Sequence, residues 1–170
     1  MGKVAVDITA SGFSPEVYGE IIAISACEML APGQVGAFFH SYIRPLRGLA
    51  PLWERLLEID NETLNSALPL AEVAEQFFDF LDGRQIVCTG YEMASEYLND
   101  ALAQLGRPAL TRGAFLSVWD LVPTDIFETS LEAVDEYAEI PPESAYPSKQ
   151  SSLRVAQAYW NVSAKQGLSD

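Results

Sequence analysis

Asp7 is the residue of this sequence whose setting is most typical of a reactive site. It follows the apolar run Val4–Val6, and the small-residue turn "TASG" comes directly after it. Carboxylates are the side chains that Mg²⁺ prefers in proteins. A second acid two residues further on would complete the pattern of a metal site, but Thr9 stands there. Two interpretations stay open: a metal ligand or, as we favour, a carboxylate that accepts N–H bonds from the turn.

Few other residues carry reactive side chains. The one histidine, His40, falls in the stretch "AFFHSYI", where we expect it at the surface or at a strand edge. Cys27 and Cys88 lie in apolar stretches, which predicts small buried thiols and no disulfide framework. This cysteine usage fits a cytoplasmic protein. The sequence shows no signal peptide, and no apolar run approaches the ~20 residues of a membrane span.

The chain is strongly acidic. It has 24 acidic and 10 basic residues, which gives a net charge of −14. A phosphate backbone attracts the opposite charge, so this composition disfavours nucleic acid as a partner. Residues 124–143 carry seven of the acids and no Lys or Arg. Such a run is commonly a solvated face, but it is also where a basic protein partner would bind, with Tyr137 as an aromatic anchor.

Strands and helices alternate along the chain in a pattern that predicts one α/β domain over residues 1–170. Strands are predicted at 4–8, 20–30, 36–45, 85–89 and 114–122, and Pro32-Gly33 closes a hairpin between the second and third. Helices are predicted at 51–59, 60–67, 68–83, 95–106, 129–140 and 151–163. The helix at 60–67 has its capping residue at Asp60 or Asn61, and the helix at 68–83 ends at Gly83.

In this layout the sequence resembles the DnaQ-like (DEDDh) 3′–5′ exonucleases over roughly residues 3–162. "VAVDITASG" is similar to the family's D-x-E-x-x-G strand, and "EIIAISACEM" and "FFHSYIRP" are similar to its next two strands. "LPLAEVAEQFFDFLDG" and "SLEAVDEYAEI" are similar to two of its helices. The resemblance implies a ribonuclease-H-like fold, with a central five-stranded mixed sheet flanked by helices.

The family uses four carboxylates to hold two divalent metal ions and a histidine as general base. Carried over by motif, the four acid positions are Asp7, Thr9, Ala94 and Ser151, and the histidine position is Tyr146. The asparagine of the motif N-x-x-F-D falls at Gly90. One acid of four remains, and the base is missing.

A lone carboxylate binds Mg²⁺ poorly. We therefore expect no bound cofactor, and we interpret the chain as a catalytically inactive exonuclease-like protein, a pseudoenzyme, that acts through protein contacts or regulation. Glu92 offers an alternative, because a one-residue alignment gap would place it at the aspartate of N-x-x-F-D. On a helix, however, it points roughly 160–200° away from Ala94. An active enzyme using Mg²⁺ or Mn²⁺ would then rely on Asp7 and Glu92.

A third interpretation is a non-catalytic binder of nucleic-acid ends. Two small basic clusters favour it: Arg44 with Arg47, and Arg107 with Arg112. The net charge disfavours it, so a protein partner, and a basic one, is the partner we expect. The oligomeric state and the choice between DNA and RNA stay open at this point.

Overall fold

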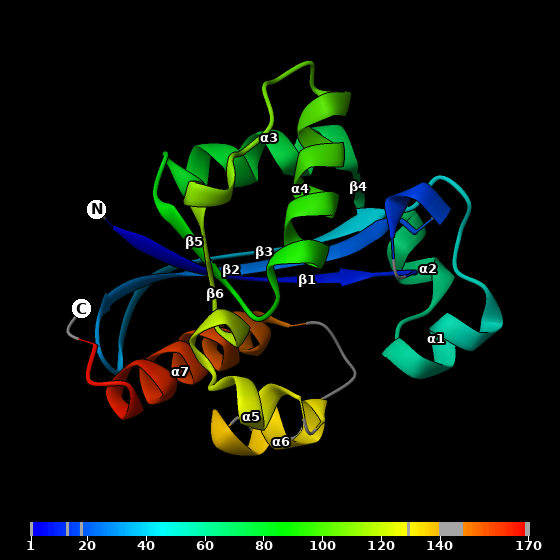
Figure 1. The fold of residues 1–170 in the computed structure, drawn as a ribbon. Helices are drawn as coiled ribbons and strands as arrows, with labels where there is room; N and C mark the ends of the chain where they lie inside the picture. Colours follow the sequence, from blue (N-terminus) through cyan, green and yellow to red (C-terminus); the bar gives the residue numbers. More distant parts are fainter. Residues whose placement is uncertain (1, 13, 18, 129, 140–147, 169–170) are drawn as a thin grey trace.

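The chain forms a central sheet with helices on both faces, as the computed structural model in Figure 1 shows. The structure describes residues 2–12, 14–17, 19–128, 130–139 and 148–168. Six strands make up the sheet, in the order β4-β3-β2-β1-β5-β6. Their bounds are β1 Lys3–Ala10, β2 Ile21–Ala31, β3 Gln34–Arg44, β4 Leu68–Pro69, β5 Gln85–Cys88 and β6 Phe115–Ser117.

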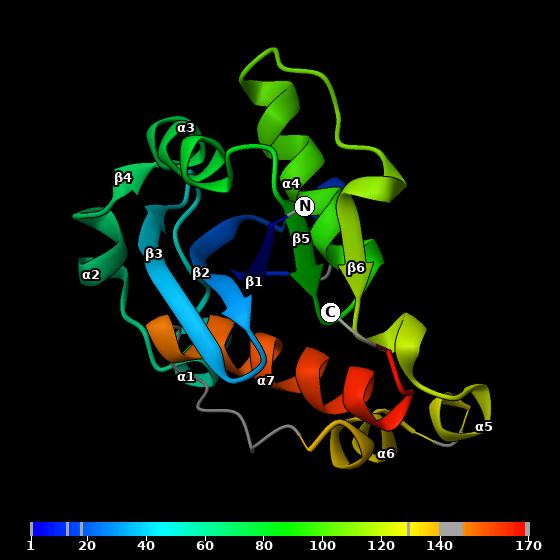
Figure 2. The same ribbon diagram turned by 90° about the vertical axis from the view of Figure 1, so that its left-hand side faces the viewer.

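The sheet is mixed, as predicted. The three long strands β1, β2 and β3 are antiparallel neighbours, whereas β5 pairs with β1 and β6 pairs with β5 in parallel. The predicted hairpin joins β2 to β3, and Gly33 at its tip has φ +75°, a conformation that glycine adopts without steric cost. Figure 2 shows β4 and β6 at opposite sides of this sheet.

Two apolar clusters fix the helices to the sheet. One face packs against α3 (Leu70–Leu81) and α4 (Tyr91–Gln104), and the other against α7 (Lys149–Lys165), with α5 (Thr124–Phe127) and α6 (Leu131–Tyr137) beyond it. Strand alternation explains the division, because Val4, Val6 and Ile8 belong to the first cluster and Ala5 to the second. A residue with the parity of Asp7 therefore faces α7.

Two further helices, α1 (Pro51–Leu57) and α2 (Asn61–Asn65), follow β3. They enclose a small third cluster of Ile22, Leu49, Ile59 and Leu64. Asp60 caps α2, since its side chain accepts a hydrogen bond from the Thr63 N–H at 2.7 Å. Of the two capping residues that the sequence offered, Asp60 is the one used.

The strand prediction needs two corrections. The sheet has six strands and not five, because the two-residue strand β4 pairs with the end of β3 and is too short to leave an alternating pattern in the sequence. The strand predicted at 114–122 covers only Phe115–Ser117, and a 3₁₀ turn, η3 (Trp119–Leu121), follows it. Two more 3₁₀ turns lie at η1 (Pro15–Val17) and η2 (Arg112–Ala114). No helix in the described part of the chain is long and apolar enough to span a membrane.

Candidate functional site

Asp7 lies in a polar row that crosses three strands. Its Cα partner on β2 is Ser25, and the partner of Ser25 on β3 is His40. Residues directly opposite each other in antiparallel strands point to the same face of a sheet, so these three side chains share the face that α7 covers. His40 is half-buried and its ring meets Tyr42 edge-on at 5.0 Å. Since β4 pairs only with Ile43 and Arg44 of β3, His40 lies on an edge stretch of the sheet, as expected.

The first turn of α7 lies over this row. The buried Ser25 donates a hydrogen bond from its Oγ to the Oγ of the buried Ser152, at 3.1 Å. The neighbouring Ser151, which we predict at the last acid position of the family motif, forms a hydrogen bond at the start of its own helix. Its Oγ accepts a hydrogen bond from the Ser148 N–H at 3.3 Å, which completes a capping box at the start of α7. Ser151 brings a hydroxyl but no charge to this end of the sheet.

Gly90, which we predict at the family's asparagine position, is the N-cap of α4. The indole ring of Trp119 lies against it, so that a Cβ at position 90 would be only 2.7 Å from Trp119 Cζ3. Trp119 also packs edge-on against Phe127 at 5.9 Å. An asparagine at position 90 would therefore have to displace this ring. The sequence did not predict this contact of Trp119 with Gly90. Its only trace there is that an aromatic residue falls in the segment predicted as a strand.

Ala94 and Glu92 lie on different sides of α4. Ala94 is 4% exposed and belongs to the apolar cluster on the α3–α4 face, whereas Glu92 is exposed in the first turn of the helix. This difference agrees with the angle of roughly 160–200° between two helical positions two residues apart. Ala94 contributes only a methyl group, and a carboxylate in its place would enter apolar surroundings.

The loop that follows Asp7 and Thr9 is fastened to α4. Tyr97 donates a hydrogen bond from its hydroxyl to the Gly12 carbonyl at 2.9 Å. Burial is the main reason why the pKa of Tyr97 is raised to about 12, with the charges of Glu96 and Asp100 adding to it. The hydroxyl therefore keeps its proton at neutral pH. Gly19 is needed here because a Cβ would be 2.1 Å from the Tyr97 oxygen.

The two thiols are buried, as expected. Burial raises the pKa of Cys27, and it raises the pKa of Cys88 to about 12. Both thiols are therefore protonated at neutral pH, and protonated thiols are poor nucleophiles. Neither cysteine is a catalytic candidate.

The donor set around Asp7 does not fit a pair of divalent ions. At the predicted family positions that the structure describes, the side chains are one carboxylate, two hydroxyls and one methyl group, from Asp7, Thr9, Ser151 and Ala94. Tyr146 lies outside the described residues. Within residues 2–168, leaving out the undescribed segments, no three His, Cys, Asp or Glu side chains gather so that they could hold a metal ion. The convergence of Thr9, Ala94 and Ser151 around Asp7 stays a prediction.

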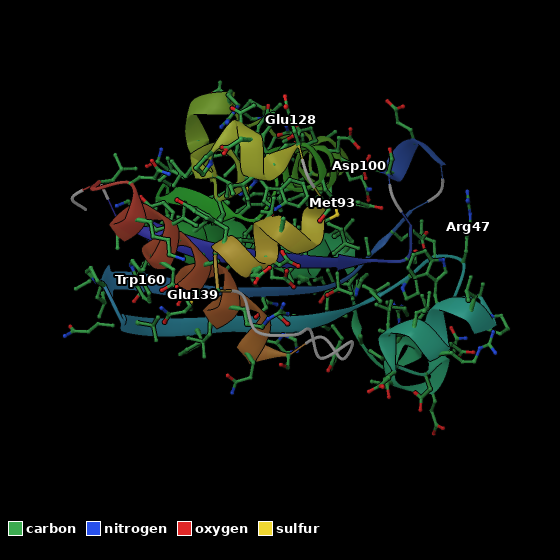
Figure 3. All side chains as sticks on the ribbon, turned by 60° about the horizontal axis from the view of Figure 1, so that its bottom comes forward. Arg47, Met93, Asp100, Glu128, Glu139 and Trp160 are labelled. Atoms are coloured by element: carbon green, nitrogen blue, oxygen red, sulfur yellow. The ribbon has the colours of Figure 1, made fainter. Side chains whose placement is uncertain are left out.

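The described part of the acidic segment, residues 124–128 and 130–139, lies on the α5–α6 side of the molecule, where Figure 3 labels Glu128 and Glu139. A lysine of helix α7 balances part of the negative charge of this segment, and the sequence did not predict that pairing. Lys165 of α7 pairs with Glu139 at 2.9 Å, donates to the Tyr137 carbonyl and lies 4.9 Å from the centroid of the Tyr137 ring. Tyr137 is thus already in contact with a cation of its own chain.

Comparisons with known proteins agree with this architecture. The sequence profile of the exonuclease family (RNase_T) matches residues 4–123. The 3′-5′ exonuclease DinG of Bacillus subtilis is 33% identical over 84 residues, 49% of this chain and 9% of its own length. The DNA polymerase III epsilon subunit of Rickettsia conorii is 26% identical over 105 residues, 62% of this chain and 46% of its own. The chain thus spans less than half the length of both curated relatives.

Solved structures show the same fold at low sequence identity. Cell-death related nuclease 4 (CRN-4) has a TM-score of 0.76 at 14% identity, and the match covers 98% of this chain and 64% of that one. The nuclease domain of 3′hExo, a DEDDh family member bound to rAMP, has a TM-score of 0.71 at 17% identity, covering 98% and 92%. Taken with the family match over most of the sequence, these likenesses show that the chain belongs to the DnaQ-like 3′–5′ exonuclease family and has its ribonuclease-H-like fold.

Proposed function

We propose that this chain is a catalytically inactive member of the exonuclease family that acts through contacts with another protein. The main support for the proposal is the set of residues that stand where the family has its acids. Ala94 is buried among apolar side chains, and the Ser151 hydroxyl caps α7. Two closely spaced divalent ions need several anions to offset their repulsion, and Asp7 is the one acid that remains at these positions.

The start of α4 supports the same proposal. In the family this turn carries an asparagine and an aspartate, but here the Trp119 ring lies against Gly90, where an asparagine side chain would begin. Restoring the motif would thus take more than replacing single residues, because the indole ring would have to move.

An active exonuclease is the alternative, and the names of the relatives favour it. DinG of Bacillus subtilis is named a 3′-5′ exonuclease. In this alternative, Asp7 and the exposed Glu92 would be ligands for Mg²⁺ or Mn²⁺. The arrangement on α4 speaks against it, because Glu92 and Ala94 point to different sides of the helix.

A hydrolysis assay separates these functions. The protein is incubated with end-labelled single-stranded DNA and RNA in Mg²⁺ or Mn²⁺, beside an active 3′–5′ exonuclease as positive control. We expect no nucleotide release from this chain. Release that stops in Asp7→Ala and in Glu92→Gln would establish the alternative. Binding of the labelled strands without hydrolysis, weakened by salt, would instead select the end-binding function.

A further inference from the structure

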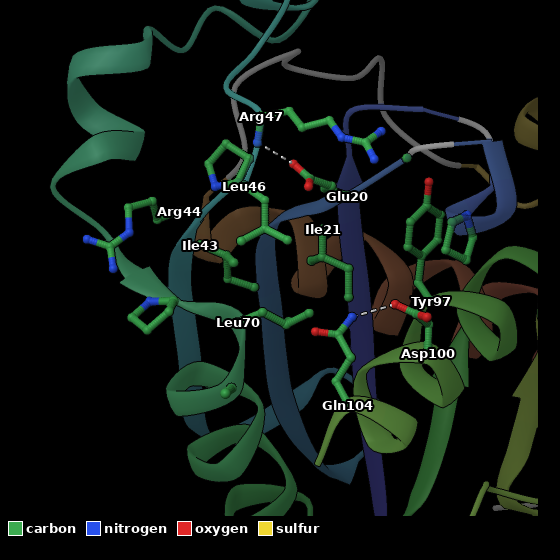
Figure 4. Close-up of a pocket in the computed structure, with 15 residues that line it drawn as sticks. Glu20, Ile21, Ile43, Arg44, Leu46, Arg47, Leu70, Tyr97, Asp100 and Gln104 are labelled. Carbon is green, nitrogen blue, oxygen red and sulfur yellow. Dashed lines mark hydrogen bonds between the residues drawn. The ribbon is translucent and has the colours of Figure 1, made fainter. Parts of the chain in front are cut away.

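A cavity of about 440 Å³ opens beside the loop that follows Asp7. Its volume is within the roughly 300–1,000 Å³ of ligand pockets. Its walls come from the start of β2, the end of β3 and the residues after it, the start of α3, and one side of α4. Figure 4 shows the side chains of Ile21, Ile43 and Leu70 pointing toward one another at its centre. Leu46 also lines it and is 93% exposed, so this apolar side chain is available to a binding partner.

Two carboxylates lie at the rim of this apolar cavity. Glu20 accepts the Arg47 backbone N–H at 3.4 Å, and Asp100 accepts the Gln104 side-chain amide at 2.8 Å (Figure 4). A carboxylate can accept about four hydrogen bonds, so both have acceptor positions left. Neither forms an ion pair with any residue that the structure describes.

Two arginines, Arg44 and Arg47, also line the cavity, and neither forms a salt bridge with these acids among the residues that the structure describes. The Arg44 guanidinium points away from it in Figure 4. The Arg47 backbone N–H donates a hydrogen bond to the Glu20 carboxylate, and Arg47 takes part in a further interaction besides this one. With the Arg44 guanidinium turned away, two carboxylates and one arginine, Arg47, remain at the cavity, on a chain whose net charge is −14.

We propose that this cavity binds a segment of a basic protein partner, which inserts a Lys or Arg side chain next to a large apolar residue. The long methylene stem of such a cation packs on the floor of Ile21, Ile43 and Leu70 while its charged end reaches Glu20 or Asp100. The opposite charges of the two proteins speed their encounter. This site goes beyond the proposed loss of hydrolysis and does not depend on it.

Three blocked dipeptides test the chemistry by varying the charge of the second side chain. Acetyl-Leu-Lys-amide carries the cation, acetyl-Leu-norleucine-amide has the same stem without the amine, and acetyl-Leu-Glu-amide carries an anion. Each is titrated into the full chain while the methyl NMR signals of Ile21, Ile43 and Leu70 are followed. We expect the lysine peptide to move these signals and to bind about two- to fivefold more tightly than the other two at low salt, as for a solvent-exposed ion pair.

Variants locate the interaction. The double variant Glu20→Gln with Asp100→Asn should bind the lysine and norleucine peptides equally, and so should the wild type at high salt. The matched control, Glu128→Gln with Glu136→Gln, removes two exposed acids from the other side of the sheet and should keep the preference. The proposal is overturned if no peptide moves the three methyl signals, if the glutamate peptide binds best, or if a single-stranded oligonucleotide moves them instead. None of these outcomes bears on hydrolysis, so the two proposals fail separately.

Discussion

Replacing Ala94 with aspartate restores the family's acid at this position, and we predict that it destabilises the fold. Ala94 is 4% exposed within an apolar cluster. Burial of this kind raises the pKa of a carboxyl group by ~2–3 units, and one unit corresponds to ~1.4 kcal/mol. Kept ionised at pH 7, the new carboxylate therefore lowers the free energy of unfolding by ~3–4 kcal/mol. That is less than the total stability of many domains of this kind, ~5–15 kcal/mol.

Urea denaturation in EDTA measures this effect, with Ala94→Asn as the control of similar size. A carboxyl whose pKa is higher in the folded than in the unfolded protein destabilises the fold only when it is ionised. The Asp variant should thus be less stable than the Asn variant at pH 7, and the difference should close as the pH falls to about 4. If the two variants differ by less than ~0.5 kcal/mol at both pH values, position 94 is not in a dry core and our reasoning about the metal site is wrong.

Three further predictions concern the neighbours of this site. Gly90→Ala should cost ~1–3 kcal/mol of stability because its Cβ meets Trp119, and Trp119→Leu should reduce that cost in a double-mutant cycle. Tyr97→Phe should cost ~1 kcal/mol of stability at neutral pH, because it removes the hydrogen bond to Gly12. The difference from wild type should shrink as the pH rises from about 10 to about 12. In that range the unfolded chain loses its Tyr97 proton while the folded protein, whose Tyr97 pKa is raised to about 12, still holds it. Cys27 and Cys88 should react with a thiol reagent only at the rate of unfolding, which a reaction time course in increasing urea would show.

The sequence predicted the sheet well where its signals were local. The long strands β1 to β3 carry apolar runs broken by few polar residues, and Pro32-Gly33 marks the turn between two of them. Helix α3 shows its buried face in the spacing of Val73, Phe77 and Leu81. By contrast, β4 has two residues and owes its pairing to tertiary contact with β3, so nothing in its own sequence marks it.

For the candidate site, motif spacing places Thr9, Ala94 and Ser151 at acid positions of the family, and this assignment stays a prediction. The spacing did not predict that Ser151 would complete a capping box, because that depends on where α7 begins. Nor did it predict Trp119 against Gly90, a contact between segments about 30 residues apart that only the folded chain brings together.

The central claim is that no two-metal centre forms around Asp7, and a Mn²⁺ titration followed by electron paramagnetic resonance tests it most directly. Exposed acids of a chain with net charge −14 bind some Mn²⁺ weakly, so wild type is compared with Asp7→Asn in the same buffer. We expect the same weak binding curve for both proteins. Two tightly bound ions per wild-type chain, lost in Asp7→Asn, would contradict it.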